Sequence, residues 1–580
     1  PMAIEFESSM QNLVYQVDAG SGRKVIQTVL FALFAFAMAA LYTFANFQGL
    51  KDARAMEEAQ LARHLATGGR LTTQCVRPLS MGILAERSPA GDAVLLAHPD
   101  LLHPPVWPAI LATAFRASGV PRTDVPTTSR VYAGDYLVVG TSHLFVILSA
   151  LLVMGIGRKL FDRRVGALSA GAFLVSDLVW RRGLAGTDFS AAMFFSLGAV
   201  YAALWAVDLP PGAGPRQEQG PAWRWVVPLA ISAVLAAAAF LTRYAAGSIA
   251  LLVFLYVGVS RRRRPWAKAF LYAALVLLCV APWLARNVSV CGNPFGLVFR
   301  EMLAGTYLFP GDALVRSLRP EMPDAGAALY AVQLKMIANL RAFFADGFGF
   351  GGAGILLGLF GAMYFHRFVR HASRTLRWCM LPAAVVLALF ASAFGAESLH
   401  ALAIYWPLAI PFGWAFFLVL LDRLQFEVRF FAASAVSAVM FLTGLPLLLN
   451  VLPPRTGLPY PPYFHPYVGW VSNMAEPGEC LTTDIPWATA WYGGRTSILL
   501  PKSIDEFYEI NDRHQKIVLA YFTTATRDKP WVRGLADPAA PEYSWYQIFA
   551  EGKVPGNFPL GHGRFIAGRD QFVLADRVRW

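Results

Sequence analysis

Eleven long apolar runs limit what this chain can fold into more than any other feature. They lie near residues 25–46, 136–157, 166–180, 188–207, 225–242, 245–260, 266–285, 348–366, 378–395, 401–421 and 429–449. Because a bilayer-crossing helix needs about 20 mostly apolar residues, these runs predict membrane spans. The composition agrees, since 56% of the residues are hydrophobic and the mean hydropathy is +0.46. We therefore predict an α-helical polytopic membrane protein with about 11 transmembrane helices.

Short basic loops give the predicted orientation. Lys and Arg cluster at 23–24, 158–164, 261–264, 367–377 and 423–429, and these segments share one side if every run is counted as a span. Positive loops favour the cytoplasmic side. Residues 1–22 are then a cytoplasmic N-terminal arm of a transmembrane module over 23–450. The loops 47–135 and 287–346 lie outside, with helices expected at 109–115 and 325–344.

The composition changes after residue 450. A proline-rich linker, 453–462, precedes a segment that alternates strand and helix patterns. Strands are predicted at 480–483, 496–500 and 517–522, and helices at 487–492 and 504–513. This order is typical of parallel pairing. We predict a small C-terminal α/β domain over 451–580, outside the cytoplasm.

The net charge of +13 does not indicate a nucleic-acid partner. Residues 453–580 carry 13 Lys and Arg and 13 Asp and Glu, so the excess belongs to residues 1–452, where positive charge sets topology and contacts anionic lipid headgroups. The five cysteines lack metal-ligand spacing and are too few for a disulfide framework. No metal site is predicted, and a divalent metal cofactor stays open.

A polar stretch over 47–108 opens the first outer loop. Apolar residues recur at helical spacing at Ala55, Ala59, Ala62 and Leu65. The pattern predicts a short amphipathic helix that ends at Gly68 and lies along the membrane surface. It would present Glu57, Glu58 and Gln60 towards water or a cleft, with Asp52 just before it.

The outer face combines acids and arginines. The acids are Asp52, Glu57, Glu58, Asp100 and Asp188, and the arginines are Arg54, Arg63, Arg181, Arg182, Arg243 and Arg286. When a sugar is transferred from a polyprenyl phosphate, the leaving group is the phosphate, so the transfer needs a base for the acceptor more than an acid. One carboxylate base contributes about 10²–10⁴-fold. Arginines or a metal ion would hold the phosphate.

Simpler interpretations exist for each of these residues. Glu57 and Glu58 are also typical of the solvated face of a surface helix. Arginines at span ends, such as Arg243, often anchor lipid headgroups. Asp188 opens a span and suits a helix cap, and His103 before two prolines suits packing or capping.

Five segments in order resemble a known superfamily. They are Glu57-Glu58-Ala59-Gln60-Leu61-Ala62-Arg63-His64-Leu65, His103-Pro104-Pro105, Gly157-Arg158-Lys159-Leu160-Phe161, Thr187-Asp188, and Arg286-Asn287 leading to Gly292-Asn293-Pro294-Phe295. The order resembles the lipid-dependent glycosyltransferases of the GT-C superfamily, particularly family 39, over about residues 1–300. The resemblance implies a GT-C fold, an outward catalytic cavity and a polyprenyl-phosphate sugar donor.

The resemblance also implies a base from the first outer loop. Many members have an aspartate where this chain has Arg54, and the nearest acids are Asp52 and Glu57. We predict Glu57 as the base and Asp52 as the second choice. The predicted substrate-binding residues are Asp100, His103, Asp188, Arg63, Arg243 and Arg286.

The predicted function is that of a glycosyltransferase in the bacterial inner membrane, with the C-terminal domain in the periplasm. It would move a sugar from a polyprenyl-phosphate carrier to a periplasmic lipid, glycan or protein acceptor. The alternative is a non-catalytic subunit that keeps this fold and serves as a docking component of a larger membrane complex. Bound polyprenyl lipid favours the first interpretation, and stoichiometric protein partners without it favour the second.

Overall fold

The computed structural model describes most of the chain. The described residues are 21–87, 97–123, 131–207, 223–261, 263–345, 354–366, 368, 370–425, 429–452, 465–526, 530–566 and 571–580. Nearly all of the predicted N-terminal arm and the whole proline-rich linker lie outside these ranges.

Eight helical segments in the described ranges are long and apolar enough to cross a bilayer. They are α2 (Ser21–Asn46), α7 (Ala133–Leu160), α10 (Phe189–Val207), α11 (Trp223–Thr242), α13 (Pro265–Cys291), α18 (His371–Ser392), η4 with α19 (Glu397–Tyr405 and Trp406–Arg423) and α20 (Arg429–Val451). Each matches one predicted apolar run. The predicted polytopic helical fold is therefore confirmed.

The other three apolar runs fold as shorter pieces. The run 166–180 is divided between α8 (Arg163–Leu174) and α9 (Asp177–Leu184). The run 245–260 forms η2 (Tyr244–Gly247) and α12 (Ser248–Gly258), and the run 348–366 contains α17 (Gly354–Ala362) and η3 (Met363–Phe365). The break before α9 is held inside the bundle, where the Tyr42 hydroxyl donates to Asp177 at 2.8 Å.

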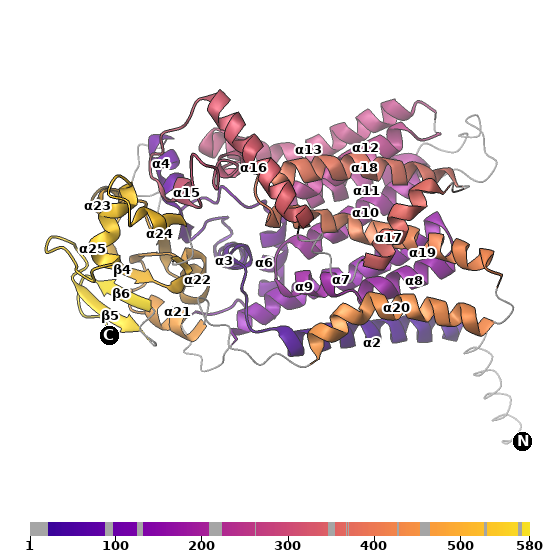
Figure 1. Cartoon of the computed structure of the whole chain (residues 1–580), viewed down its shortest axis with the longest axis horizontal. Helices are drawn as coiled ribbons and strands as arrows, with labels where there is room; N and C mark the ends of the chain where they lie inside the picture. The colour runs from indigo at the N-terminus through magenta and orange to yellow at the C-terminus, as the bar shows by residue number, and fades with distance from the viewer. Residues whose placement is uncertain are drawn as a thin grey trace, which may run out of the picture.

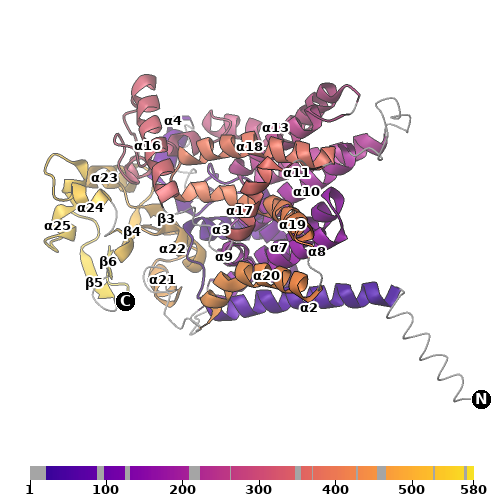
Figure 2. The same ribbon diagram turned by 45° about the vertical axis from the view of Figure 1, so that its right-hand side comes forward.

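The helix bundle has a buried centre and an apolar outer surface. α10 and the η4–α19 segment are the most buried spans, whereas α2, α13 and α20 are the most exposed. The small residues Ala191, Ala199 and Ala203 of α10 are fully buried, which lets neighbouring helix backbones approach closely. α2 and α20 run beside each other along one edge (Figures 1 and 2). Exposed apolar helices of this length suit a lipid environment.

A six-stranded sheet lies at one end of the bundle (Figure 1), which we call the sheet end. Its order is β1-β3-β2-β4-β6-β5, with β1 (Cys75–Val76), β2 (Cys480–Thr483), β3 (Thr496–Leu499), β4 (Ile517–Phe522), β5 (His562–Ile566) and β6 (Gln571–Ala575). β2 pairs in parallel with β3 and β4, and β6 pairs antiparallel with β4 and β5. The predicted strands and their parallel pairing are confirmed, and β1, β5 and β6 were not predicted.

Short helices connect and flank these strands. They are α21 (His465–Ser472), α22 (Pro486–Gly493), α23 (Ile504–Arg513), η5 (Thr524–Thr526), α24 (Pro530–Gly534), η6 (Pro541–Trp545) and α25 (Tyr546–Phe549). α22 and α23 match the two helices predicted here. Ser503 caps α23, because its side chain accepts the Glu506 amide.

Both long loops gather at the sheet end. The first contains α3 (Ala53–Gly68), α4 (Pro78–Arg87) and α6 (Val106–Ser118), and the second contains α14 (Val298–Glu301), α15 (Ala313–Arg316) and α16 (Ala325–Ala345). The helices predicted at 109–115 and 325–344 are confirmed as α6 and α16. The loops and the C-terminal sheet therefore share one side of the bundle.

The first loop and the C-terminal sheet are built as one unit. β1 belongs to the loop and pairs in parallel with β3, with Cys75 opposite Ser497. A single apolar core contains Trp107 and Phe115 of α6 together with Trp491 of α22. The C-terminal segment therefore forms a wall of the space around α3.

Candidate functional site

Helix α3 carries two of the five predicted acids, Glu57 and Glu58, and its ends follow local rules. Asp52 is the N-cap, and its side chain accepts the Arg54 amide. Gly69 follows the last turn at φ 67°, a left-handed conformation that closes helices at low steric cost. The predicted helix is therefore confirmed.

The predicted exposure of this helix is wrong. Glu57, Glu58 and Gln60 are buried from water. The helix does not lie on the membrane surface with one face free, because α6 packs against one side and α22 of the C-terminal segment against another. The idea of a solvated acidic face fails for the same reason.

One buried group of charges, the Glu57 cluster, comprises Glu57, Arg77, His103 and Asp100. Arg77 Nη2 lies 2.7 Å from Glu57 Oε1, and His103 Nε2 lies 3.2 Å from Glu57 Oε2. His103 Nδ1 lies 3.0 Å from Asp100 Oδ1. Asp100 Oδ2 also accepts the His103 amide at 2.7 Å. The imidazole is thus held between two carboxylates.

The electrostatics of the Glu57 cluster favour a charged imidazole. Burial opposes the charge, but Asp100 and the neighbouring Glu57 and Glu58 outweigh it and raise the pKa of His103 to about 9. Burial likewise opposes the Asp100 carboxylate, and His103 outweighs it and holds the pKa of Asp100 below its usual range. The cluster is a compensated ionic network with both Glu57 oxygens occupied.

A second group, the arginine site, lies where α3 meets the start of α10. Arg54 Nη2 is 2.7 Å from Asp188 Oδ2, and Arg54 Nε is 2.9 Å from Glu58 Oε1. Arg243 Nε is 3.2 Å from Asp188 Oδ1. Asp188 and Glu58 are fully buried, whereas the side chains of Arg54 and Arg243 are 34% and 23% exposed. Arg182 completes the site.

Positive charge exceeds negative charge at the exposed side of the arginine site. Arg182 and Arg243 both lie near the Phe189 ring, 5.9 and 5.7 Å from its centroid. Burial, together with Arg243 and Arg181, lowers the pKa of Arg182 to about 10. By contrast, burial and the nearby Asp188 raise the pKa of Glu58 to about 8. This imbalance suits an anionic ligand.

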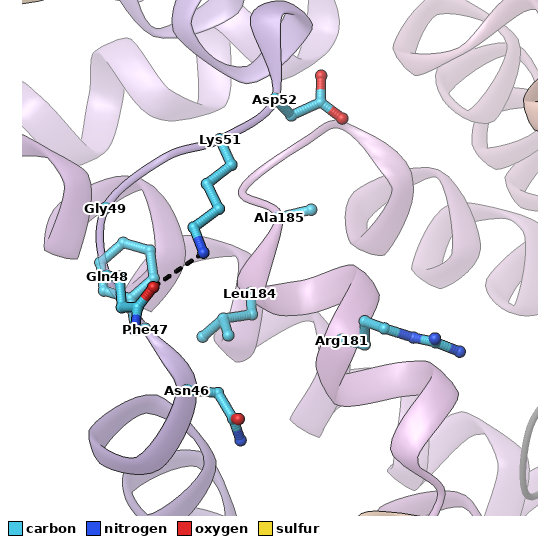
Figure 3. A pocket seen from close by; sticks show the side chains of 9 residues that line it. All are labelled: Asn46, Phe47, Gln48, Gly49, Lys51, Asp52, Arg181, Leu184 and Ala185. Carbon is cyan, nitrogen blue, oxygen red and sulfur yellow. Dashed lines mark hydrogen bonds between the residues drawn. The ribbon is translucent and has the colours of Figure 1, made fainter. Parts of the chain in front are cut away.

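A polar cavity of about 340 Å³ adjoins this site (Figure 3). It is lined by Asn46, Phe47, Gln48, Gly49, Lys51, Asp52, Arg181, Leu184 and Ala185. Lys51 Nζ donates to Gln48 Oε1 at 2.9 Å within the loop that lines the cavity. Asp52 is exposed and is close enough to Arg54 and Arg182 to influence both electrostatically. The cavity therefore contains an exposed carboxylate close to the arginine site.

An apolar groove of about 540 Å³ lies in the helix bundle. Residues of α11, η2, α12, α13, α14 and α18 line it, among them Phe240, Tyr244, Phe254, Tyr272, Phe295, Phe299 and Phe390. Tyr244 directly follows Arg243. Chain neighbours of the arginine site therefore line both spaces, with Tyr244 in the apolar groove and Asp52 and Arg181 in the polar cavity.

Two predicted arginines have other contacts. Arg63 donates to the backbone oxygens of Trp491 and Ala490 at 2.7 and 2.6 Å. Arg286 donates to the backbone oxygen of Asp100 at 2.7 Å. The structure brings neither guanidinium into the arginine site.

The sequence alone assigned no role to Arg54, Glu58 or Arg182, although all three are charged residues of the predicted outer face.

Within the described ranges, no group of three or more His, Cys, Asp or Glu side chains is arranged to hold a metal ion. The five cysteines are free.

No protein-family model and no curated protein sequence matches the chain. Solved structures do resemble it. ArnT from Cupriavidus metallidurans bound to undecaprenyl phosphate aligns with a TM-score of 0.58 at 12% identity, over 95% of this chain and 98% of that one. The archaeal oligosaccharyltransferase AglB from Archaeoglobus fulgidus, in complex with an inhibitory peptide and a dolichol-phosphate, aligns with a TM-score of 0.53 at 12% identity. That alignment covers 95% of this chain and 75% of AglB.

The chain has the GT-C fold. The ArnT alignment spans nearly the whole length of both chains, so the likeness includes the small C-terminal sheet region as well as the helix bundle. The fold expected from the sequence is therefore confirmed.

Replacing His103 tests the Glu57 cluster. We expect His103→Gln to lower the free energy of unfolding by about 3 kcal/mol near neutral pH, since it leaves two buried carboxylates without their shared cation. Because the pKa of His103 is raised in the folded state, its contribution is complete below about pH 6.5 and is lost as the pH rises through about 9. Thermal unfolding of the purified protein at pH 6 and pH 9.5 measures this.

The matched control is His562→Gln, at an exposed position on β5. It should unfold like the unaltered protein at both pH values. Equal pH dependence in the unaltered protein and in His103→Gln would contradict a charged His103.

Proposed function

We propose that this protein is a membrane glycosyltransferase that uses a polyprenyl-phosphate sugar as donor. The fold likeness supports the class, because the similar ArnT and AglB structures contain undecaprenyl phosphate and dolichol-phosphate. The observation that carries the proposal is local to this chain. Tyr244, next to Arg243, lines an apolar groove, and the exposed carboxylate of Asp52, near Arg54 and Arg182, lines a polar cavity.

Each part of a lipid-linked donor has a matching environment. The isoprenoid chain would lie in the apolar groove, where aromatic rings and aliphatic side chains exclude water. Its phosphate would bind Arg182 and Arg243, with Arg54 beside them. The buried Asp188 carboxylate pairs with both Arg54 and Arg243, so their guanidinium groups are oriented before a ligand binds. Preorganised arginines bind phosphate with less loss of side-chain freedom.

The transfer itself needs one base. The acceptor oxygen or nitrogen attacks the anomeric carbon, and its bond to that carbon forms while the bond to the phosphate oxygen breaks. The polyprenyl phosphate leaves with the electron pair, and the acceptor proton passes to a carboxylate. Asp52 suits this role, because it is exposed at the cavity and lies near the arginines.

The geometry favours Asp52 over Glu57 as this base. Both Glu57 oxygens have cationic partners, and its side chain is only 4% exposed. Asp52 uses one oxygen to cap α3 and lines the cavity. In this proposal the Glu57 cluster, including Asp100 and His103, holds α3 in place.

We place the sheet end in the bacterial periplasm. The basic segments 158–164 and 261–264 follow span ends opposite the sheet, and positive loops favour the cytoplasm. The acceptor would then be a periplasmic lipid, glycan or protein that enters the cavity. The 451–580 segment would be a periplasmic domain.

One observation favours the alternative, a non-catalytic docking subunit. Arg54 stands at the start of α3 and pairs with both Asp188 and Glu58, so two of the site's three nearest carboxylates are neutralised. Only Asp52 remains to accept a proton from a ligand in the cavity. Turnover measurements on Asp52 variants therefore separate the two functions.

Replacing Arg182 tests donor binding. We expect Arg182→Gln to weaken the binding of undecaprenyl phosphate about 10- to 100-fold, since a charge-assisted hydrogen bond contributes about 1.5–3 kcal/mol. Native mass spectrometry with added lipid measures the dissociation constant. The control Arg319→Gln removes the same charge at an exposed position beside Glu509 and should bind normally. Equal affinities in both variants would contradict this binding mode.

Replacing Asp52 tests the base. Asn caps helices as well as Asp does, so we expect Asp52→Asn to fold and to bind undecaprenyl phosphate normally while turnover falls about 10²–10⁴-fold. The assay is the release of undecaprenyl phosphate from a panel of undecaprenyl-phosphate sugars. Loss of turnover in Glu57→Gln, with Asp52→Asn fully active and both variants equally stable, would transfer the role to Glu57. No turnover in the unaltered protein across the panel would favour the docking subunit.

A further inference from the structure

A buried carboxylate, Asp135, links the C-terminal sheet region to the cavity. It lies in the first turn of α7 and is fully buried. Its Oδ1 accepts the Trp491 indole N–H at 2.8 Å. Its Oδ2 accepts the Tyr492 hydroxyl at 3.2 Å and the Leu50 amide at 3.3 Å. One side chain thus joins α22, α7 and the loop that precedes α3.

The loop held by Asp135 is a wall of the cavity. Phe47, Gln48 and Gly49 line the cavity on one side of Leu50, and Lys51 and Asp52 line it on the other. Gly49 has φ 102°, a conformation that L residues rarely adopt. The loop therefore needs glycine at position 49, and the next residue, Leu50, donates its amide to Asp135 in the middle of the loop.

The C-terminal side of this link is also fixed. Arg63 of α3 donates to the backbone oxygens of Trp491 and Ala490, and its guanidinium lies 5.0 Å from the Trp491 ring centroid. α22 therefore contacts α3 directly, and through Asp135 it is linked to Leu50, two residues before the α3 N-cap. Within the described ranges Asp135 forms no ion pair, so its carboxyl group is held by these three hydrogen bonds.

We propose that Asp135 is a positioning residue through which α22 sets the place of Asp52 and Lys51 in the cavity. This inference rests on the proposed function only in giving Asp52 the role of base. It adds a role for the C-terminal segment, which controls the geometry of the transfer step through Trp491 and Asp135. A displacement of α22 changes the cavity and leaves the apolar groove as it was.

Trp491→Phe tests the link, because it removes the indole N–H and keeps an aromatic ring. We expect amide hydrogen exchange of the 47–52 segment to become at least about 10-fold faster, since Asp135, the acceptor of the Leu50 amide, loses one of the two side-chain hydrogen bonds that hold its carboxyl group. We expect kcat for sugar transfer to fall about 10-fold, with KM for the donor and the affinity for undecaprenyl phosphate unchanged. If Trp491 had a purely structural role, Trp491→Phe would lower the stability of the protein without lowering kcat selectively at unchanged KM.

The matched control is Trp545→Phe. Trp545 is equally buried in the same part of the chain, and its indole nitrogen has no hydrogen-bond partner. This variant should leave exchange over 47–52 and kcat unchanged. Asp135→Asn is the second test variant and should also speed exchange of this segment. Unchanged exchange over 47–52 in both Trp491→Phe and Asp135→Asn, or an equal effect of Trp545→Phe, would overturn the inference.

The exchange measurement needs no substrate. If the unaltered protein binds no polyprenyl phosphate, the proposed function fails, and faster exchange in Trp491→Phe still supports the link. If the lipid binds normally and exchange is unaffected, the link fails and the proposed function stands.

Discussion

The site depends on compensated burial of negative charge around α3. Glu57 and Asp188 both lie out of contact with water, and a buried carboxylate without a partner costs several kcal/mol. Each has at least one cationic neighbour within 3.2 Å. These cations come from four segments: Arg54 from α3, Arg77 from just before α4, His103 from the 98–103 segment and Arg243 from the turn before η2. The ion pairs therefore fix how these segments pack together.

This arrangement decides which groups remain for a ligand. The carboxylates that hold the segments together are already paired, so they contribute position more than proton transfer. Arg182 and the exposed faces of Arg54 and Arg243 retain positive charge for a ligand. The Asp52 carboxylate remains available to a ligand, because its structural role is to cap α3 with one oxygen. The site thus separates residues that build it from residues that contact a substrate.

Much of the fold followed from the sequence, because bilayer spans and strand–helix alternation are strong local signals. The eight long spans, α3, α22, α23 and the parallel β2–β3–β4 core are of this kind. β1 could not be predicted, since two residues inside a polar loop show no period and become a strand only beside β3. The burial of Glu57 and Glu58 was missed for a related reason. Their neighbours, Arg77 and His103 at Glu57 and Asp188 at Glu58, are distant in sequence.

The site residues show the same division. Asp188 and Arg243 were predicted as ligand-binding residues, and the structure brings them together at the arginine site. Arg54, first noted as a departure from the pattern of similar proteins, pairs with Asp188 across 134 residues of chain. Arg63 was predicted to hold phosphate, yet it contacts α22. No local pattern distinguishes an arginine that faces a cavity from one that bonds to a distant backbone.

The central claim is that the arginine site and the apolar groove together bind a polyprenyl phosphate. A cryo-electron microscopy map of the protein in lipid nanodiscs with undecaprenyl phosphate tests it most directly. We expect density for the phosphate between Arg182 and Arg243, and continuous density for the isoprenoid chain along Phe240 and Tyr272 in the groove. A map with ordered side chains at the site and no lipid density there, at saturating lipid, would contradict the account.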